Sequence, residues 1–304
     1  MFSKKIYEAY FDKWLSGVQS EIAFWYSIIS TKGEACGKGG ELWQEVISNE
    51  RPFVLDEDIT SPVTCFLDVG SGPFSRCGLK SEKTALEFHA VDALAPAYKI
   101  MKNYFGIASG ITPEFGFAEL VGDIYEEDSF DIVHMSNSLD HCVEPLIAIY
   151  NLLFVCKIGG KVILRHAKNE AVRENYEGFH QWNLNIENGD FIIWNDSNKF
   201  NITELLSGIA KIYVYENIVE LPFKRWIYDK VVIHKIVSCQ IPDNFFRVVC
   251  IAKLADAFFE QNLLYKNNTE ILRRCDAYEK KISLQEKIIR RLTRDIEKFQ
   301  NDLK

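Results

Sequence analysis

The 304-residue sequence lacks the features that mark several common classes of protein. None of its apolar runs approaches the roughly 20 residues of a membrane-spanning helix, and its N-terminus lacks the long apolar core of a signal peptide. Its eight cysteines include no Cys-x-x-Cys pair and lie mostly in apolar runs. We therefore expect buried free thiols in a reducing compartment, with no metal site, and we predict a cytoplasmic location.

Positive charge is also scarce. Lys and Arg number 35 against 43 Asp and Glu, which gives a formal net charge of -8. This balance disfavours a protein whose main task is to hold nucleic acid by its phosphates. The chain is instead rich in apolar side chains, with 47% hydrophobic and 13% aromatic residues. That composition is sufficient for one large domain with an appendage, and it argues against overall disorder.

A glycine turn lies at the centre of the sequence pattern. Val63 to Val69 is mostly apolar and has the length of a buried parallel strand, and it runs into Gly70-Ser71-Gly72, where we expect a turn into a helix. Asp68 precedes this turn and can orient it or meet a cationic or hydroxyl-bearing ligand. A dinucleotide fingerprint requires a third glycine where this chain has Ser75, so the pattern disfavours NAD.

Two later strands also end in polar residues. Ala85 to Val91 ends in Asp92, whose carboxylate can accept hydrogen bonds from ribose hydroxyls. The alternative is that Asp92 caps the next helix, which we consider weaker because Pro96 should delay that helix. The strand Ile132 to Met135 is followed by Asp140-His141, an acid beside a base of near-neutral pKa. Equally, Asp140 could cap a helix and His141 pack beside it.

The order of these elements resembles class I S-adenosylmethionine-dependent methyltransferases. The residues that carry the resemblance are Leu67 to Pro73, the acid at 92, the polar strand end after Met135, and the predicted turn Gly159-Gly160 before a strand from Lys161 to Leu164. The match covers about residues 60 to 170. It implies a Rossmann-like methyltransferase sheet with S-adenosylmethionine as cofactor, and N-terminal helices that cover the cofactor. The amino-acid sequence around the turn is also similar to that of methyltransferases encoded with bacterial surface-polysaccharide enzymes.

The resemblance implies a set of cofactor contacts and one departure from the family. In many members an aspartate near the place of Phe117 binds the adenine amino group, whereas Phe117 is expected to fill the core here. Ala118 and Glu119 could supply a backbone amide and a carboxylate in its place, and Asp123 is a rival acid. The implied cofactor-binding residues are Asp68, Gly70, Ser71, Gly72, Asp92, Ala118, Glu119 and Asn137.

The acceptor side is predicted from polar residues at the same sheet edge. His166 and His180 follow the fifth strand, in a segment with interleaved aromatic residues, and either could instead be a surface histidine. With His141 and Asp140 they are the candidate catalytic residues. The implied reaction transfers a methyl group to an oxygen or nitrogen of a small-molecule or glycan acceptor, and His141 or another histidine removes the proton.

Three regions are predicted: a helical cover over 1–60, a methyltransferase domain over 61–255, and a coiled coil over 256–304. Apolar residues at helical spacing from Ile6 to Ile29 predict one or two helices, and steps of four and three from Ile271 to Leu303 predict a coiled-coil seam that makes the chain a homo-oligomer. A lone amphipathic helix is the weaker alternative. The alternative function is a non-catalytic methyltransferase-like scaffold. The further strand candidates are Phe191 to Trp194, Lys211 to Tyr215, Val231 to Ile236 and Arg247 to Ala252.

Overall fold

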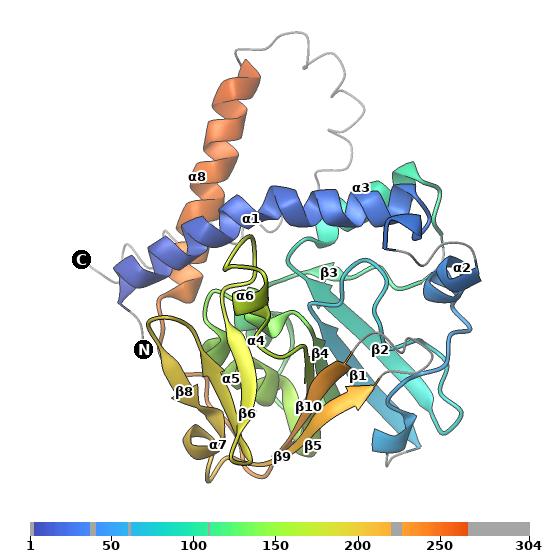
Figure 1. Cartoon of the computed structure of the whole chain (residues 1–304), viewed down its shortest axis with the longest axis vertical. Coiled ribbons are helices and arrows are strands. Elements are labelled where there is room, and N and C mark those ends of the chain that lie inside the picture. Colours follow the sequence, from blue (N-terminus) through green and yellow to red (C-terminus); the bar gives the residue numbers. More distant parts are fainter. Residues whose placement is uncertain (1–2, 37–40, 60–61, 109, 220–226, 267–304) are drawn as a thin grey trace. The chain divides into compact units, whose positions relative to one another are not determined.

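A computed structural model describes residues 3–36, 41–59, 62–108, 110–219 and 227–266 (Figure 1). The chain divides into a unit built on Asp12–Asn244 and a second one that combines Ser3–Phe11 with the segment from Phe245 onward. The predicted coiled-coil seam lies outside the described residues and stays a prediction. No helix in the described ranges is both long and apolar enough to cross a membrane.

The first unit is organised around a seven-stranded sheet in the order β3-β2-β1-β4-β5-β10-β9 (Figure 1). The first five strands in this order are parallel to their neighbours, whereas β10 runs antiparallel to both β5 and β9. The strand order reverses between β1 and β4, and ligands of open α/β sheets bind at such a point. The strands are β1 (Val63–Val69), β2 (Ala85–Asp92), β3 (Glu114–Phe115), β4 (Phe130–Ser136), β5 (Cys156–His166), β9 (Ala210–Val219) and β10 (Ile227–Lys235).

The central strands form because their side chains are buried on both faces. Phe66 and Leu67 are neighbours in β1 and point to opposite faces, yet both are fully buried. Helix α5 (Pro145–Val155) contacts β4 and β5 and is apolar around almost its whole circumference, as expected of a helix inside the core. The predicted Rossmann-like sheet is therefore confirmed, including its last antiparallel pair.

The described residues also form a smaller sheet and further helices. A three-stranded antiparallel sheet comprises β6 (Asn183–Glu187), β7 (Asp190–Trp194) and β8 (Lys199–Asn201). The N-terminal pattern forms the single helix α1 (Lys4–Ser30). The other helices are α2 (Glu41–Ile47), α3 (Ala95–Tyr104), α4 (Val121–Ile124), α6 (Glu170–Arg173), α7 (Ile202–Leu205) and α8 (Phe246–Lys266), and short 3-10 turns are η1 (Glu34–Cys36), η2 (Asp56–Asp58), η3 (Ala118–Leu120) and η4 (Leu139–His141).

Four local expectations were wrong. Arg247 to Ala252 is not a strand but the beginning of α8. Residues 70–84 form turns where a helix was expected after β1. Gly159-Gly160 does not precede β5 but lies inside it, where the pairing with β4 shifts register. Helix α3 begins at Ala95, because Pro96 is in the first turn, where its missing N–H costs nothing.

Candidate functional site

The glycine turn lies at the carboxyl end of β1, at the switch point of the sheet. Gly70 and Gly72 have φ angles of +64° and +62°, which L side chains rarely adopt. A Cβ on Gly70 would collide with Ser138, and one on Gly72 would lie 3.0 Å from the ring of Trp25. Both positions therefore require glycine, and the turn lets a ligand approach its backbone closely.

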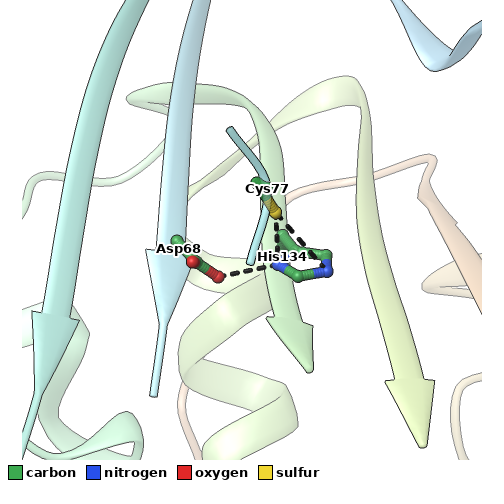
Figure 2. Close-up of side chains that lie close together, drawn as sticks. All are labelled: Asp68, Cys77 and His134. Carbon is green, nitrogen blue, oxygen red and sulfur yellow. Dashed lines mark hydrogen bonds and ion pairs between the residues drawn. The ribbon is translucent and has the colours of Figure 1, made fainter. Parts of the chain in front are cut away.

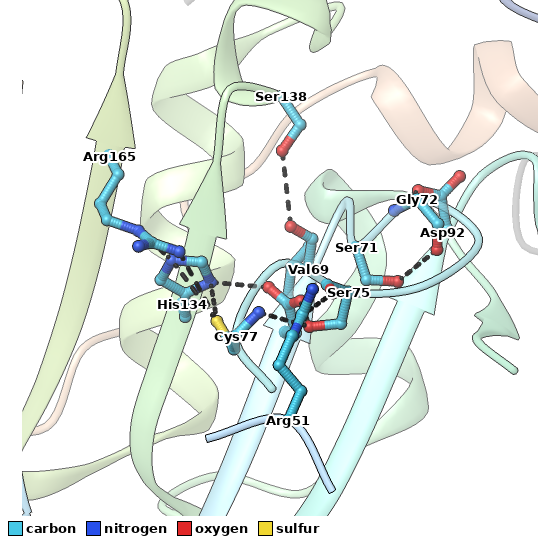
Figure 3. Close-up of polar contacts among 11 residues, drawn as sticks. Arg51, Val69, Ser71, Gly72, Ser75, Cys77, Asp92, His134, Ser138 and Arg165 are labelled. Atoms are coloured by element: carbon cyan, nitrogen blue, oxygen red, sulfur yellow. Dashed lines mark hydrogen bonds and ion pairs between the residues drawn. The ribbon is translucent and has the colours of Figure 1, made fainter. Parts of the chain in front are cut away.

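Asp92 holds this turn in place. Its Oδ2 accepts a 2.9 Å hydrogen bond from the Gly72 amide (Figure 3). Its Oδ1 accepts one of 2.8 Å from the amide of Leu94, just before α3. Burial raises the pKa of Asp92 to about 6, despite these two donors. A carboxylate has about four lone-pair sites, so both oxygens can accept a further hydrogen bond. Asp92 thus acts near the helix start and remains available to a ligand at the turn.

Residues of α1 lie over the same edge of the sheet. The ring of Trp25 packs against Gly72 and meets Tyr98 edge-to-face at 6.0 Å. Its Nε1 donates a 2.8 Å hydrogen bond to Glu21, whose charge also helps to raise the pKa of Asp92. The sequence analysis missed Glu21 and Trp25 as site residues. Their only signal was the four-residue spacing that places them on one helix face.

Trp14, nearer the start of α1, packs among aromatic side chains. Trp14 stacks on Phe179 with ring centroids 5.0 Å apart and packs against Phe117 at 5.1 Å. Phe117 is buried, as the sequence predicted for a core-filling residue. Phe179 also contacts the ring of His141, so α1, the segment before β6 and the polar end of β4 meet at one place.

A network of buried, hydrogen-bonded polar side chains supports the glycine turn. Figure 2 shows Asp68 of β1 directed at His134 of β4, with Oδ1 2.7 Å from Nδ1, and Cys77 with its sulfur 3.2 Å from the same nitrogen. Arg165 of β5 donates from Nε to His134 Nε2 at 2.9 Å (Figure 3). Because His134 Nε2 accepts this bond, its proton lies on Nδ1 and is donated to Asp68.

The same side-chain network holds the loop that follows the glycine turn. Ser75 has a φ of +43° and donates from its hydroxyl to Asp68 at 2.6 Å. The Ser75 hydroxyl also accepts from the Cys77 amide, and Arg51 donates to the Ser75 carbonyl. Burial raises the pKa of the Cys77 thiol well above its ordinary value, so this sulfur is not a nucleophile. Asp68 is therefore a positioning residue with both oxygens engaged.

The predicted acid and two of the predicted histidines come together beside the turn. His180 Nδ1 lies 2.7 Å from Asp140 Oδ2, and His141 Nε2 lies 3.3 Å from His180 Nδ1 and 3.5 Å from Asp140 Oδ2. Asp140 is buried, whereas the imidazole side chains are 19% and 23% exposed, so the cluster can be reached from outside. His141 also helps to lower the pKa of Asp92. Ser138, two residues before Asp140, packs against Gly70, so the cluster is close to the glycine turn.

The pKa values of the cluster follow from its contacts. Burial raises the pKa of Asp140, but His141 and His180 outweigh it, and the net pKa is lowered. Burial lowers the pKa of His180, but its hydrogen bond to Asp140 and nearby acids outweigh it, and the net pKa is raised. The pair is thus stabilised as an aspartate with a protonated histidine. Asp140 does not cap α5, whose N-cap is Glu144.

The remaining predicted residues have mainly structural contacts. The Glu119 carboxylate accepts from the amides of Val143 and Glu144, at the start of α5, and burial raises its pKa to about 7. Ala118 is buried beside it, and Asp123 is exposed.

Three further predicted residues lie nearer the sheet edge. Asn137 has a φ of +50° and accepts at its side-chain oxygen from the Ala167 amide, tying β4 to β5. Ser71 donates to the Gly72 carbonyl. His166 is buried beside a small cavity that it shares with Asn185, and burial lowers its pKa to about 3, so it is a weak base.

Comparison with known proteins identifies relatives in structure but not in sequence. No family model and no curated protein matches the chain. Three similar solved structures are a complex of the Haloferax volcanii Trm112 methyltransferase activator with a candidate methyltransferase (12% identity, 71% of this chain and 98% of that chain, TM-score 0.45), an S-adenosylmethionine-dependent methyltransferase from Aquifex aeolicus (16%, 65% and 94%, 0.37) and an rRNA methylase from Streptococcus thermophilus (12%, 60% and 92%, 0.33). At these identities and scores the likeness concerns the fold, and function must be argued from the chain's own residues.

The fold nevertheless has a definite class. A parallel sheet in this order, an antiparallel pair at its far edge, and a glycine turn at its switch point define a Rossmann-like fold. The fold that the sequence resemblance implied is confirmed.

Proposed function

We propose that this protein is an S-adenosylmethionine-dependent methyltransferase. The observation that carries the proposal is the glycine turn that ends without a helix, since residues 70–84 form turns. A dinucleotide needs a helix N-terminus at this place for its pyrophosphate. S-adenosylmethionine has no phosphates, so a bare turn with an acid at the next strand end suits it better.

The side chains around the turn also suit this cofactor. Asp92 offers carboxylate oxygens to ribose hydroxyls, which are hydrogen-bond donors. Glu21 and the Trp25 ring favour a positive charge, which the sulfonium carries. The cofactor supplies an activated methyl group, and the chain's residues would bind and orient it at the sheet edge.

The acceptor would meet the cofactor beside Asp140, His141 and His180. This cluster is reachable, close to Asp92, and able to bind or deprotonate a nucleophile. The acceptor we propose is a hydroxyl or amine of a small molecule or glycan, because the net charge of -8 disfavours nucleic acid. The surface-polysaccharide resemblance makes glycans the first acceptors to examine. The five buried free cysteines among the described residues favour the cytoplasm.

The cofactor proposal predicts that Gly72→Ala weakens S-adenosylmethionine binding by more than about 10-fold. The added Cβ would strain a left-handed backbone, at about 1–2 kcal/mol, and would press on Trp25. Titration calorimetry with S-adenosylmethionine, S-adenosylhomocysteine and NAD should show binding of the first two alone. Gly189→Ala is the matched control, since its φ of +88° is equally strained but the space around it is open. Tight binding of NAD, or no binding of either adenosyl compound, would contradict the proposal.

The assembly proposal concerns the segment beyond the described residues. The apolar positions from Ile271 to Leu303 repeat at steps of four and three, so we propose that they make the chain a homo-oligomer. Sedimentation equilibrium of the full chain should give a dimer or trimer at micromolar concentration. A chain ending at Leu264 should be monomeric and still bind cofactor, because the glycine turn lies far upstream. A monomeric full-length chain would refute the proposal.

A further inference from the structure

The cluster at the polar end of β4 brings together side chains that are common metal ligands. Three potential ligand atoms, Asp140 Oδ2, His141 Nε2 and His180 Nδ1, face one another. One proton between His180 and Asp140 accounts for the 2.7 Å contact. His141 Nε2 lies 3.3 Å from His180 Nδ1 and 3.5 Å from Asp140 Oδ2, so both imidazoles direct a nitrogen at the same carboxylate oxygen.

We infer that Asp140, His141 and His180 bind one divalent transition-metal ion. The role of the ion in the reaction rests on the proposed methyltransferase function, whereas its binding does not. The three atoms are separated by 2.7, 3.3 and 3.5 Å. A circle through them has a radius of about 1.9 Å, just below the metal–ligand length of about 2.0–2.2 Å. One ion can therefore bind all three atoms from slightly outside their plane with little movement.

Neighbouring atoms supply a second observation. Asp140 Oδ1 and Glu170 Oε2 are both buried, and neither has a hydrogen-bond partner among the described residues. Burying an unpaired carboxylate oxygen is costly, so two such atoms at one place indicate a missing cation. Burial raises the pKa of Glu170, and the negative charge of Asp140 raises it further, whereas His180 lowers it. Glu170 therefore interacts electrostatically with both residues. A cation at the three ligand atoms would replace the proton between His180 and Asp140 and offset the buried carboxylate of Asp140.

The ligand types decide between kinds of ion. Mg²⁺ and Ca²⁺ prefer oxygen ligands throughout, whereas two imidazoles with one carboxylate are typical of Zn²⁺ and of non-haem Fe²⁺. Three protein ligands leave at least one coordination position open. In the proposed reaction an acceptor hydroxyl would bind there and lose its proton to solvent. The oxygen–carbon bond would then form as the sulfur–methyl bond breaks, and sulfur would keep the electron pair.

The second group of possible ligands does not qualify. Asp68, Cys77 and His134 also lie close together, but Arg165 donates to the outer nitrogen of His134 and lies 3.8 Å from the Cys77 sulfur. A permanently charged guanidinium already neutralises this group and repels a metal ion. Cys77, in the segment between β1 and β2, is therefore a control position.

The test is to measure metal content and metal binding in the full-length protein. After treatment with a chelator, titration with Co²⁺ should give the visible absorption of a four- or five-coordinate ion with one equivalent per chain, and Zn²⁺ should displace it. Loss of an outer partner alone costs about 10- to 100-fold in metal affinity, so His180→Ala and Asp140→Asn should each lower it by more than about 100-fold. Cys77→Ala and His89→Gln should bind as the unaltered chain does.

Cofactor binding by the same variants separates this inference from the proposed function. If the unaltered chain binds S-adenosylmethionine but no Co²⁺ or Zn²⁺, the metal inference fails and the methyltransferase proposal stands. If it binds metal but no cofactor, the reverse holds. Circular dichroism confirms that each variant is folded, and Asp140→Asn keeps the side-chain shape in case His180→Ala does not fold. Equal metal affinity in folded Asp140→Asn would also overturn the inference.

Discussion

Replacing Arg165 with methionine is expected to lower the free energy of unfolding by about 3–5 kcal/mol, the cost of leaving a buried charge without its partner. Arg165 is 2% exposed, and its charge is connected to Asp68 through His134. Without it, the Asp68 carboxylate stays buried beneath the glycine turn with no positive charge to offset it. Urea denaturation followed by circular dichroism measures this change.

Two control variants test the explanation for Arg165→Met. The double variant Asp68→Asn/Arg165→Met should recover part of the loss, because both charges are then absent. Lys168→Met removes a lysine that is paired with Glu216 at the surface, and it should cost less than about 1 kcal/mol. A loss below about 1 kcal/mol in Arg165→Met itself would mean that the buried side-chain network contributes little to stability.

Replacing Asp92 with asparagine is expected to weaken S-adenosylmethionine binding by about 10- to 100-fold, since a hydrogen bond to a charged group contributes about 1.5–3 kcal/mol. Asparagine has one acceptor oxygen for the two amides of Gly72 and Leu94, so the turn should loosen as well. Titration calorimetry gives the affinity. Asp123→Asn removes an exposed acid of the same unit and should have no effect.

The pH dependence of cofactor affinity distinguishes an Asp92 carboxylate that binds the cofactor from one with only a structural role. Its pKa lies at about 6, set first by burial and then by its backbone donors, with smaller effects of Glu21 and His141. Protonation removes an acceptor, so cofactor affinity of the unaltered chain should fall as pH drops through about 6. The affinity of Asp92→Asn should vary less over this range. Equal slopes in the two proteins would mean that a group other than Asp92 titrates over this range.

The sheet was predictable because its strands are short apolar runs between clear turns. β1, β2 and β4 have this pattern, and residues of β1 and β4 are buried on both faces. The same rule failed for Arg247 to Ala252, an apolar run of similar length. Phe246, Val249 and Cys250 are buried there at spacings of three and four, the period of a helix. In so short a run the two periods are hard to distinguish, and tertiary packing decides between them.

The site was predictable where chemistry depends on neighbours in the sequence, as in Gly70 to Gly72 or Asp140-His141. Contacts between residues on different strands were not predictable from the sequence. Asp68 and His134 are partners in the register of β1 and β4, and a shift by one residue would place them on opposite faces. His180 reaches Asp140 from beyond β5, across about 40 positions in the sequence. Such meetings depend on register and loop path, which no local pattern specifies.

The turn segment without a helix has a consequence for hydrogen exchange. In a helix each amide bonds to a carbonyl four residues earlier, so exchange there measures local unwinding. Here the amides of Gly70, Gly72 and Leu79 bond instead to Val91, Asp92 and Arg51, on other segments of the chain. These amides can exchange only when the segment separates from its surroundings. Their exchange rates therefore measure how often the floor of the candidate site opens as one piece.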